Sequence, residues 1–514
     1  MNRFLSPAIA LLLAATAAFT PASAEKLVIM HTNDTHSHID PEADGSGGIL
    51  RRKSMIDSIR QAEQNTLLID AGDFVQGSLY FYLYGGKIEQ ELMNRLGYDM
   101  RILGNHEFDI GTDSIAKILK DSHAELIATN YDLSGSALDS LFRPMAIKEF
   151  DGRRIGFFAI NLDPEGMIAP GKADGVRYLD GIQAANAAAW WLRNIEHCDM
   201  VVALTHIGYN TPGADLTDIA LASGTRNIDL IIGGHSHDIV QPGDDDMPDK
   251  IPDLDGHEVT IVQAGKYGRN LGKIDIDLDN LAITPSLLPV ISNGANATDP
   301  ELAEWLTPYR QGLDSLYADK VFRASAEMPQ GSEALKNFLS DFIYDRAMES
   351  TGGVDFAIMN DGGIRRGLPK GNVGKGYILE MLPFGNSTVV LDIKGSDLAD
   401  AFDVMAQGRV TAVSRQVDVE YTPAVKNGQE NTPGKIQSIR INGRPLDPDR
   451  TYRIATIDYL ADGGDYMKPL LRAGKVSQSD SDLAEDIIRY FQSGKGRGKT
   501  VKPDNSPRFH ISLK

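Results

Sequence analysis

The stretch "MRILGNHEFDIG", residues 100–111, joins a short apolar run to a loop that carries an amide, an imidazole and two carboxylates. The run "MRIL" has the length of a buried strand, and Gly104 and Gly111 bound the polar loop. One polar loop after one strand is ordinary protein surface. The significance of this loop therefore depends on which residues follow the other strands of the chain.

The same succession of a strand and a polar segment recurs along the first half of the chain. Amphipathic stretches typical of helices, such as "KIEQELMNRL" (87–96), lie between several of the apolar runs. This alternation predicts an α/β domain with buried sheets. The apolar runs are "KLVIM" (26–30), "TLLID" (66–70), "MRIL" (100–103), "RIGFFAI" (154–160), "MVVAL" (200–204) and "IDLII" (228–232).

Five of the predicted strands lead directly into clusters of polar residues. Ligands of open α/β sheets bind outside the carboxyl ends of the strands, so these five clusters can converge on one crevice. Their carboxylates and imidazoles suit first-row divalent ions, and they are too many for one tetrahedral site. Two metal ions are therefore expected, with Asp73 suited to bridge them. The candidate ligands are Asp34, His36, Asp73, Asn105, His206, His235 and His237.

The composition of the chain bounds its class and its location. With 514 residues, two domains are the first expectation, and 42% hydrophobic and 24% charged residues are typical of a globular protein. A formal net charge of -20 argues against nucleic-acid polymers as partners, because their binding needs a basic surface. The single cysteine, Cys198, excludes an intrachain disulfide and is interpreted as a buried apolar thiol.

The amino terminus has the pattern of an export signal. Arg3 is followed by an apolar run and then by small residues ending at Ala24, so residues 1–24 are predicted to be a cleaved signal peptide. The apolar run is too short for a membrane span, and no later stretch offers a transmembrane anchor. The mature protein is therefore expected to be periplasmic or secreted. Nothing in the sequence indicates its oligomeric state.

The second half of the chain has a different pattern. A long helical segment, 299–319, separates the first region from a mixed region with strands at "VDFAIMN" (354–360), "TVVLDIK" (388–394) and "YRIATI" (452–457). Two glycine-rich loops, "NDGGIRRG" (360–367) and "DYLADGGDYM" (458–467), can bring backbone amides close to an anion. Taken alone, either loop is better interpreted as an ordinary turn.

The polar clusters, taken in order, resemble a known family. "HTNDTH", "GDFVQG", "GNHEFD", "THIG" and "GGHSHD" are similar to the metallophosphoesterase domain of the 5'-nucleotidases, which include bacterial UDP-sugar hydrolases and animal ecto-5'-nucleotidase. The resemblance implies an α/β fold with a four-layer α/β/β/α metallophosphoesterase domain. It places this domain at 25–297, a linker helix at 298–320, and a smaller α+β 5'-nucleotidase C-terminal substrate-binding domain at 321–514.

The resemblance also implies roles for the clustered residues. Two divalent ions, zinc or manganese, are expected. His106 and Asp109 are the implied catalytic dyad, and their spacing lets the Asp109 carboxylate accept a hydrogen bond from the imidazole and fix its tautomer. One ion is assigned to Asp34, His36, Asp73 and His237, and the other to Asp73, Asn105, His206 and His235.

The loops of the second region match the substrate-binding segments of the family. Phe384 and Tyr459 correspond to two rings that stack on a nucleobase, whereas without the resemblance a small core is the favoured interpretation of both rings. Asp465 is the implied acceptor for a ribose hydroxyl, and Arg365 the implied phosphate ligand. The full set of expected substrate residues is Asn360, Gly363, Arg365, Phe384, Asn386, Tyr459 and Asp465.

The chain departs from the family pattern at several positions. Family members have an arginine for phosphate shortly before the helix at "EALKNFLSDF" (333–342), whereas the segment "EMPQGS" (327–332) has none. Arg366 and Arg323 are the candidates to compensate for it. The family has glycine at the positions of Ser37 and Tyr466, where a side chain narrows the backbone freedom.

The predicted function is that of an exported two-metal phosphoesterase that removes the 5'-phosphate of nucleoside monophosphates, a small-molecule substrate. The alternatives are a broader enzyme, acting on UDP-sugars or 2',3'-cyclic nucleotides, and a noncatalytic nucleotide-binding protein. An intact His106–Asp109 dyad argues against the last alternative, because a pure binding protein has no evident use for it.

Overall fold

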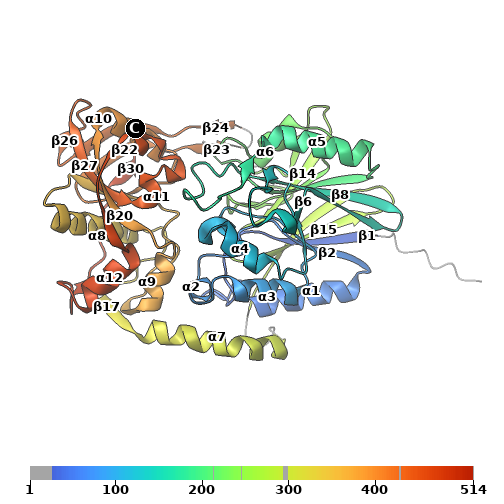
Figure 1. Cartoon of the computed structure of the whole chain (residues 1–514), viewed down its shortest axis with the longest axis horizontal. Helices are drawn as coiled ribbons and strands as arrows, with labels where there is room; N and C mark the ends of the chain where they lie inside the picture. The colour runs from blue at the N-terminus through green and yellow to red at the C-terminus, as the bar shows by residue number, and fades with distance from the viewer. Residues whose placement is uncertain (1–25, 212–213, 245, 293–298, 428–429, 513–514) are drawn as a thin grey trace, which may run out of the picture.

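The computed structural model describes residues 26–211, 214–244, 246–292, 299–427 and 430–512. Figure 1 shows two domains side by side, with a long helix that runs along one edge from one domain to the other. The expected signal peptide, residues 1–24, lies outside the described residues. Within these ranges, no helix combines the length and the apolar character needed to cross a membrane.

The first domain is built on two sheets of seven strands each. β1 to β4 are parallel, as are β8, β10, β11 and β14, so the carboxyl ends of each set lie at one edge of its sheet. The first sheet has the order β16 (Ile283–Pro289), β15 (Asn270–Asp277), β1 (Lys26–Thr32), β2 (Asn65–Asp70), β3 (Met100–Arg101), β4 (Glu125–Ile127), β6 (Phe142–Arg143). The second has the order β12 (Ile239–Val240), β14 (Glu258–Ala264), β11 (Leu230–Ile232), β10 (Met200–His206), β8 (Arg153–Asn161), β7 (Met145–Phe150), with β13 (Lys250–Pro252) beside β14.

Both faces of the first sheet are buried, which explains why its central strands are continuous apolar runs. Successive side chains of a strand point to opposite faces. Leu27 and Ile29 of β1 pack between the two sheets, against residues such as Phe157 of β8. Val28 and Met30 point the other way and pack against the helices that cover the first sheet.

Helices cover the outer face of each sheet. α1, α3 and α4 contribute apolar side chains to the core of the first sheet, and α5 and α6 contribute to that of the second. The helices are α1 (Ile49–Ala62), α2 (Leu79–Tyr84), α3 (Lys87–Leu96), α4 (Thr112–Leu119), α5 (Gly181–Asn194) and α6 (Asp218–Gly224). The result is the four-layer α/β/β/α arrangement that was expected, visible on the right of Figure 1.

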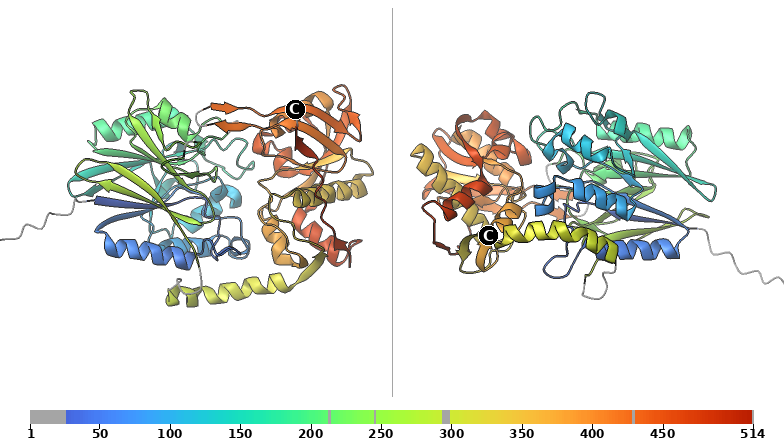
Figure 2. Two further views of the ribbon diagram at one scale, coloured as in Figure 1. Left: turned by 180° about the vertical axis from the view of Figure 1, so that it is seen from behind. Right: turned by 60° about the horizontal axis from the view of Figure 1, so that its bottom comes forward.

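The linking helix is α7 (Pro300–Ala318). It begins at Asp299, whose side-chain oxygen accepts a hydrogen bond from the backbone N–H of Leu302 at 2.8 Å, with Pro300 in the first turn. Arg310 Nε donates to Asp40 Oδ1 at 2.8 Å, which attaches the helix to the first domain. In the two further views of Figure 2, α7 again runs from one domain to the other.

The second domain is an α+β unit around a five-stranded sheet. This sheet has the order β21 (Ala412–Val413), β18 (Phe356–Met359), β27 (Thr451–Ile457), β20 (Ser387–Lys394), β28 (Gly474–Asp482). A four-stranded sheet has the order β26 (Arg444–Pro445), β25 (Lys435–Ile441), β22 (Val417–Thr422), β30 (Phe509–Ile511), and a three-stranded sheet the order β19 (Gly371–Gly374), β17 (Lys320–Ala324), β29 (Thr500–Val501). The helices are α8 (Glu333–Thr351), α9 (Lys375–Met381), α10 (Gly395–Met405), α11 (Asp458–Ala461) and α12 (Leu483–Gln492).

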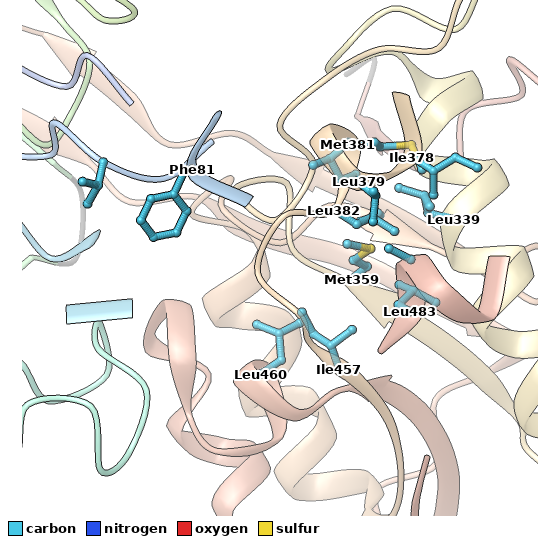
Figure 3. Close-up of a cluster of buried hydrophobic side chains, with 14 of the residues drawn as sticks. Phe81, Leu339, Met359, Ile378, Leu379, Met381, Leu382, Ile457, Leu460 and Leu483 are labelled. Carbon is cyan, nitrogen blue, oxygen red and sulfur yellow. The ribbon is translucent and has the colours of Figure 1, made fainter. Parts of the chain in front are cut away.

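Part of the core of this domain lies directly behind the substrate loops. Figure 3 shows Met359 of β18, Leu339 of α8, Met381 of α9 and Leu483 of α12 in one cluster. Each of these side chains is buried. The cluster fixes the ends of β18 and α9, and the expected substrate residues follow immediately after both elements.

Candidate active site

The polar clusters that follow β1, β2, β3, β10 and β11 meet at one place, as the parallel strands require. Three of the expected metal ligands, Asp34, His36 and His237, form one group in which the ligand atoms all lie within 4.8 Å of one another. His237 Nε2 lies 3.4 Å from Asp34 Oδ1 and 3.0 Å from His36 Nε2. Residues from two different sheets therefore form one compact set of ligands.

A second group adjoins the first. Asp73, His206 and His235 again place their ligand atoms within 4.8 Å of one another. Asn105 joins this group, because its Oδ1 lies 2.9 Å from His235 Nδ1. Asp73 Oδ2 lies 3.1 Å from His206 Nε2 and 3.8 Å from His36 Nε2, so this carboxylate stands between the two groups.

The ligand atoms in both groups are better arranged to bind cations than to form hydrogen bonds with one another. His206 Nδ1 lies 2.7 Å from the carbonyl oxygen of Ala71, so Nδ1 carries the proton and donates it there. Nε2 lies 3.1 Å from Asp73 Oδ2. Burial would lower the pKa of His206, but the carboxylates of Asp73 and Asp34 outweigh it and raise the pKa to about 10, so without a metal ion a proton occupies Nε2. A buried carboxylate beside an imidazole needs a positive charge, and a divalent ion bound by both groups would take the place of that proton, so the residues fit divalent ions.

The protonation states of the other rings agree with a ligand role. Burial lowers the pKa of His36, His235 and His237 well below the ordinary value, so these imidazoles are neutral and can offer lone pairs. For Asp73, burial would raise the pKa, but the neighbouring His206 and His106 outweigh it and the pKa lies well below its usual range. This carboxylate is therefore ionised.

The backbone of these loops adopts unusual conformations. A positive φ is uncommon for residues other than glycine, and it is concentrated at functional sites. Ser37 also has a positive φ, 58°, a conformation that glycine adopts most readily. The ligands with a positive φ are Asp34 (52°), His36 (47°), Asp73 (58°), His235 (83°) and His237 (61°).

The loops also pack too closely for side chains at some positions. A Cβ atom at Gly104 would lie 2.2 Å from Asp73 Oδ1, and one at Gly72 would lie 2.7 Å from the backbone nitrogen of Gly104. Such distances are shorter than van der Waals contact. The two glycines therefore allow the loops after β2 and β3 to touch.

Glu107 has a larger role than that of a first-turn helix residue, which is all that its position in the sequence indicates. Its side chain is fully buried, and its carboxylate accepts the backbone N–H groups of Phe74 at 2.9 Å and Asp73 at 3.1 Å. It also accepts the N–H of Gly104. Glu107 therefore ties the loop of Asp73 to the loop of Asn105.

His106 and Asp109 form the expected pair in the 3-10 helix η1 (His106–Ile110). His106 Nδ1 donates to Asp109 Oδ2 at 2.8 Å, which leaves Nε2 facing the substrate side, 3.3 Å from Arg365 Nη2. Burial alone would lower the pKa of His106, but the carboxylates of Asp109 and Asp73 outweigh it, and the pKa is raised. The backbone N–H of His106 also donates to Asp73 Oδ1 at 2.9 Å.

A cavity of about 600 Å³ extends from the metal-binding residues to the second domain. Arg365 Nη2 reaches His36 Nδ1 at 3.4 Å, and the Phe384 ring lies 5.5 Å from the His106 ring between centroids. Asn360 Nδ2 donates to Asp465 Oδ2 at 2.7 Å. The cavity is lined by all seven expected substrate residues, which are Asn360, Gly363, Arg365, Phe384, Asn386, Tyr459 and Asp465.

The two arginines expected to compensate for the missing one do not line this cavity. Arg366 is paired with Glu380 and donates to the hydroxyl of Tyr317 at 2.9 Å. Arg323 lies exposed on β17. A different arginine, Arg409, lines the cavity, and its position after α10 gave no local signal because only the folded chain brings that loop to the site.

Each half of the chain matches a known protein family. Residues 27–238 match the model of the calcineurin-like phosphoesterases, and residues 316–472 match that of the 5'-nucleotidase C-terminal domain. The chain is 27% identical to human 5'-nucleotidase over 503 residues, which covers 88% of this chain and 86% of the human protein. It is 29% identical to the trifunctional nucleotide phosphoesterase protein YfkN of Bacillus subtilis over 491 residues, covering 85% of this chain but 32% of that longer protein.

A solved structure supports the same relationship. The 5'-nucleotidase precursor of Thermus thermophilus superposes with a TM-score of 0.80 at 27% sequence identity, covering 95% of this chain and 100% of that one. The two matched domains occur in the same order as the two domains of the fold described above. The chain belongs to the 5'-nucleotidase family of metal-dependent phosphoesterases.

Proposed function

We propose that this protein hydrolyses the 5'-phosphate of nucleoside monophosphates. The observation that carries the proposal is the single cavity of about 600 Å³, which is lined both by metal-binding candidates such as Asp73 and by aromatic and polar residues of the second domain such as Phe384. The phosphate of a nucleotide would lie beside the metal-binding candidates, and its nucleoside would lie beside the aromatic and polar residues of the second domain. The family assignment supports the same reaction class, hydrolysis of phosphoric monoesters.

We assign the metal ligands as follows. Zinc or manganese suits a set of imidazoles and carboxylates of this kind. Divalent ions held there supply Lewis-acid polarisation of a phosphoryl oxygen and activation of water. One ion is assigned to Asp34, His36, Asp73 and His237, and the other to Asp73, Asn105, His206 and His235.

The catalytic dyad acts on the side of the phosphate that faces the second domain. His106 Nε2 would donate to a phosphoryl oxygen or to the leaving 5'-oxygen, where negative charge develops. Asp109 holds the ring in position through the 2.8 Å hydrogen bond to Nδ1. Arg365, 3.3 Å from His106 Nε2, would bind the phosphate with its guanidinium, a geometry suited to bidentate contact.

The remaining cavity residues are assigned to the nucleoside. Phe384 and Tyr459 would stack on the base, and Asn386 would contact its edge. Asn360 and Gly363 shape the loop that carries Arg365, and Asn360 fixes the carboxylate of Asp465. Asp465 would accept a hydrogen bond from a ribose hydroxyl.

We further propose that residues 1–24 are removed on export to the periplasm or the medium, and that the mature chain divides at 25–297, 298–320 and 321–514. The expected cleavage after Ala24 can be checked by sequencing the amino terminus of the mature protein. A mature chain that retains residues 1–24 would contradict export by this route.

The central experiment is phosphate release from a panel of substrates, with metal analysis of the same sample. The panel holds nucleoside monophosphates, a UDP-sugar, a 2',3'-cyclic nucleotide and a simple aryl phosphate. The proposal expects the highest kcat/KM for a nucleoside monophosphate and close to two equivalents of divalent ion. A higher kcat/KM for the UDP-sugar or the cyclic nucleotide would favour the broader phosphoesterase, and no turnover at all would favour a binding protein.

A further inference from the structure

Arg409 is a cationic residue of the substrate cavity that has no counterpart in the expected site. It follows α10 and lines the cavity from the second domain. Its Nη1 lies 3.8 Å from Asp465 Oδ1, which is an ion-pair distance but too long for a hydrogen bond. The Arg409 side chain is 25% exposed and that of Asp465 is 11% exposed, and both residues line the cavity, so the gap between them lies at the cavity wall.

The position of Arg409 is fixed without using its side-chain donors. Its backbone oxygen accepts the N–H of Asp361 at 3.0 Å. Its guanidinium lies over the ring of Tyr466, with Cζ 5.2 Å from the ring centroid. Within the described part of the chain, no hydrogen bond of the guanidinium is found, so its N–H groups remain available to a ligand.

Asp465 presents one free acceptor to the same gap. Its Oδ2 is occupied by the 2.7 Å hydrogen bond from Asn360 Nδ2, which leaves Oδ1 facing Arg409. The backbone N–H of Asp465 donates to the hydroxyl of Tyr459 at 3.2 Å, so the Asp465 backbone is held beside one of the two rings assigned to the base. The gap therefore lies next to the place where a nucleobase is expected.

The chemistry of this gap favours a neutral group with hydroxyls over a second phosphate. The Asp465 carboxylate would repel an anion and partly neutralises Arg409. A hydroxyl needs a donor and an acceptor at once, and vicinal hydroxyls can use both members of the pair. Phosphate is better placed at the other end of the cavity, where Arg365 Nη2 lies 3.4 Å from His36 Nδ1 and 3.3 Å from His106 Nε2.

We propose that Arg409 and Asp465 together bind the vicinal 2'- and 3'-hydroxyls of the ribose, and that Arg409 makes the enzyme selective for ribonucleotides. Asp465 accepts from one hydroxyl through Oδ1, and Arg409 donates to the hydroxyl oxygens. This inference rests on the proposed function, because it takes the substrate to be a nucleotide.

The test compares adenosine monophosphate with its 2',3'-dideoxy analogue on the native enzyme and on Arg409→Gln. In the native enzyme, kcat/KM is expected to be about tenfold or more higher for the ribonucleotide. Arg409→Gln is expected to lower kcat/KM for the ribonucleotide about tenfold and to change that for the dideoxy analogue by less than about twofold. Equal losses on both substrates, or no loss on either, would overturn the proposal.

Two variants separate a binding role from a structural one. Arg409→Lys keeps donors near the hydroxyls and is expected to recover part of the selectivity. Arg415→Gln is the matched control, because Arg415 is 45% exposed and pairs with Asp345 outside the cavity, so selectivity should stay at the native value. A selectivity loss in Arg415→Gln as large as that in Arg409→Gln would contradict the assignment.

A binding measurement keeps this test independent of the proposed activity. Calorimetry with adenosine and with 2',3'-dideoxyadenosine needs no turnover. Adenosine is expected to bind the native enzyme more tightly than the dideoxy nucleoside does, and Arg409→Gln should remove most of the difference. If the native enzyme does not hydrolyse adenosine monophosphate but shows this difference in affinity, the proposed function fails and the hydroxyl site stands. If the enzyme hydrolyses adenosine monophosphate but shows no difference in affinity, the proposed function stands and the hydroxyl site fails.

Discussion

His206 Nε2 and Asp73 Oδ2 lie 3.1 Å apart in a fully buried part of the site. The Nδ1 proton of His206 is committed to the carbonyl oxygen of Ala71 at 2.7 Å. Burial would lower the pKa of His206, but the carboxylates of Asp73 and Asp34 raise it to about 10, so without a metal ion a proton occupies Nε2. A divalent ion bound by His206 and Asp73 would displace this proton, and several expected outcomes depend on that exchange.

Removal of the metal by a chelator should abolish activity and lower the melting temperature. A ligand held at about 1,000 times its Kd stabilises the folded state by about 4 kcal/mol, so a fall of about 5 °C or more is expected. Phosphate release and thermal unfolding of the same sample measure both effects, before and after zinc or manganese is restored. An unchanged melting temperature in the metal-free sample would contradict the cation role of these residues.

The substitution Asp73→Asn should reduce the bound metal from two equivalents to one at most. Asp73 is the carboxylate nearest to both groups of ligands, and an amide is a weaker ligand with no charge. Metal analysis of the purified variant checks this. The control is Asp279→Asn, an exposed position far along the chain from the site, which should keep the native metal content.

The substitution His106→Ala should lower kcat by about 100-fold or more, the usual contribution of a positioned acid or base. Metal content should stay at the native value, because the ring is held by Asp109 and faces the substrate side. Steady-state kinetics and metal analysis of one preparation measure both. His510→Ala is the control, since that ring pairs with Asp418 near the end of the chain; an unaltered kcat in His106→Ala would remove the dyad from the mechanism.

The substitution Gly104→Ala should disturb the metal site through a single methyl group. The added Cβ would lie 2.2 Å from Asp73 Oδ1, so the carboxylate must move. Overpacking of this kind costs about 1 to 3 kcal/mol. We expect a lower melting temperature and less bound metal, whereas Gly353→Ala, where no atom lies within 4 Å of the new Cβ, should behave as the native protein does.

The substitution Phe384→Ala should raise KM for nucleoside monophosphates and leave hydrolysis of a simple aryl phosphate nearly unchanged. Stacking on an aromatic ring contributes about 1 to 3 kcal/mol per base, which corresponds to roughly fivefold to 150-fold in affinity. Kinetics on both substrates separate the base contact from the chemistry. Equal losses on the two substrates would show that the ring supports His106, its neighbour at 5.5 Å, rather than a base.

Much of the first domain could be predicted from the sequence, for a physical reason. Strands buried on both faces must be apolar throughout, so runs such as "MVVAL" stand out without any alignment. Parallel strands then bring their carboxyl ends together, which placed residues as distant as His36 and His237 in one site. The four-layer arrangement itself followed from the family resemblance, because the strand order cannot be read from the runs.

Other features could not be predicted from the sequence, because they depend on contacts between segments that are distant along the chain. Glu107 had the pattern of an ordinary first-turn acid, yet its carboxylate binds backbone N–H groups of a loop more than thirty positions away. Arg409 lies in a loop with no motif, whereas Arg366, which does lie in a motif, is held outside the cavity by Glu380. Charge and spacing could not distinguish these two arginines.

The left-handed backbone at Asp34, His36, Asp73, His235 and His237 restricts which mutations can reach this centre. Aspartate, asparagine and histidine tolerate that conformation better than most residues, whereas β-branched side chains tolerate it poorly. Valine and threonine are therefore disfavoured at these positions by backbone strain, independently of whether their side chains could coordinate a metal ion. Substitutions that change the metal preference of this site are therefore restricted to the few residue types that tolerate a positive φ and can also coordinate a metal ion.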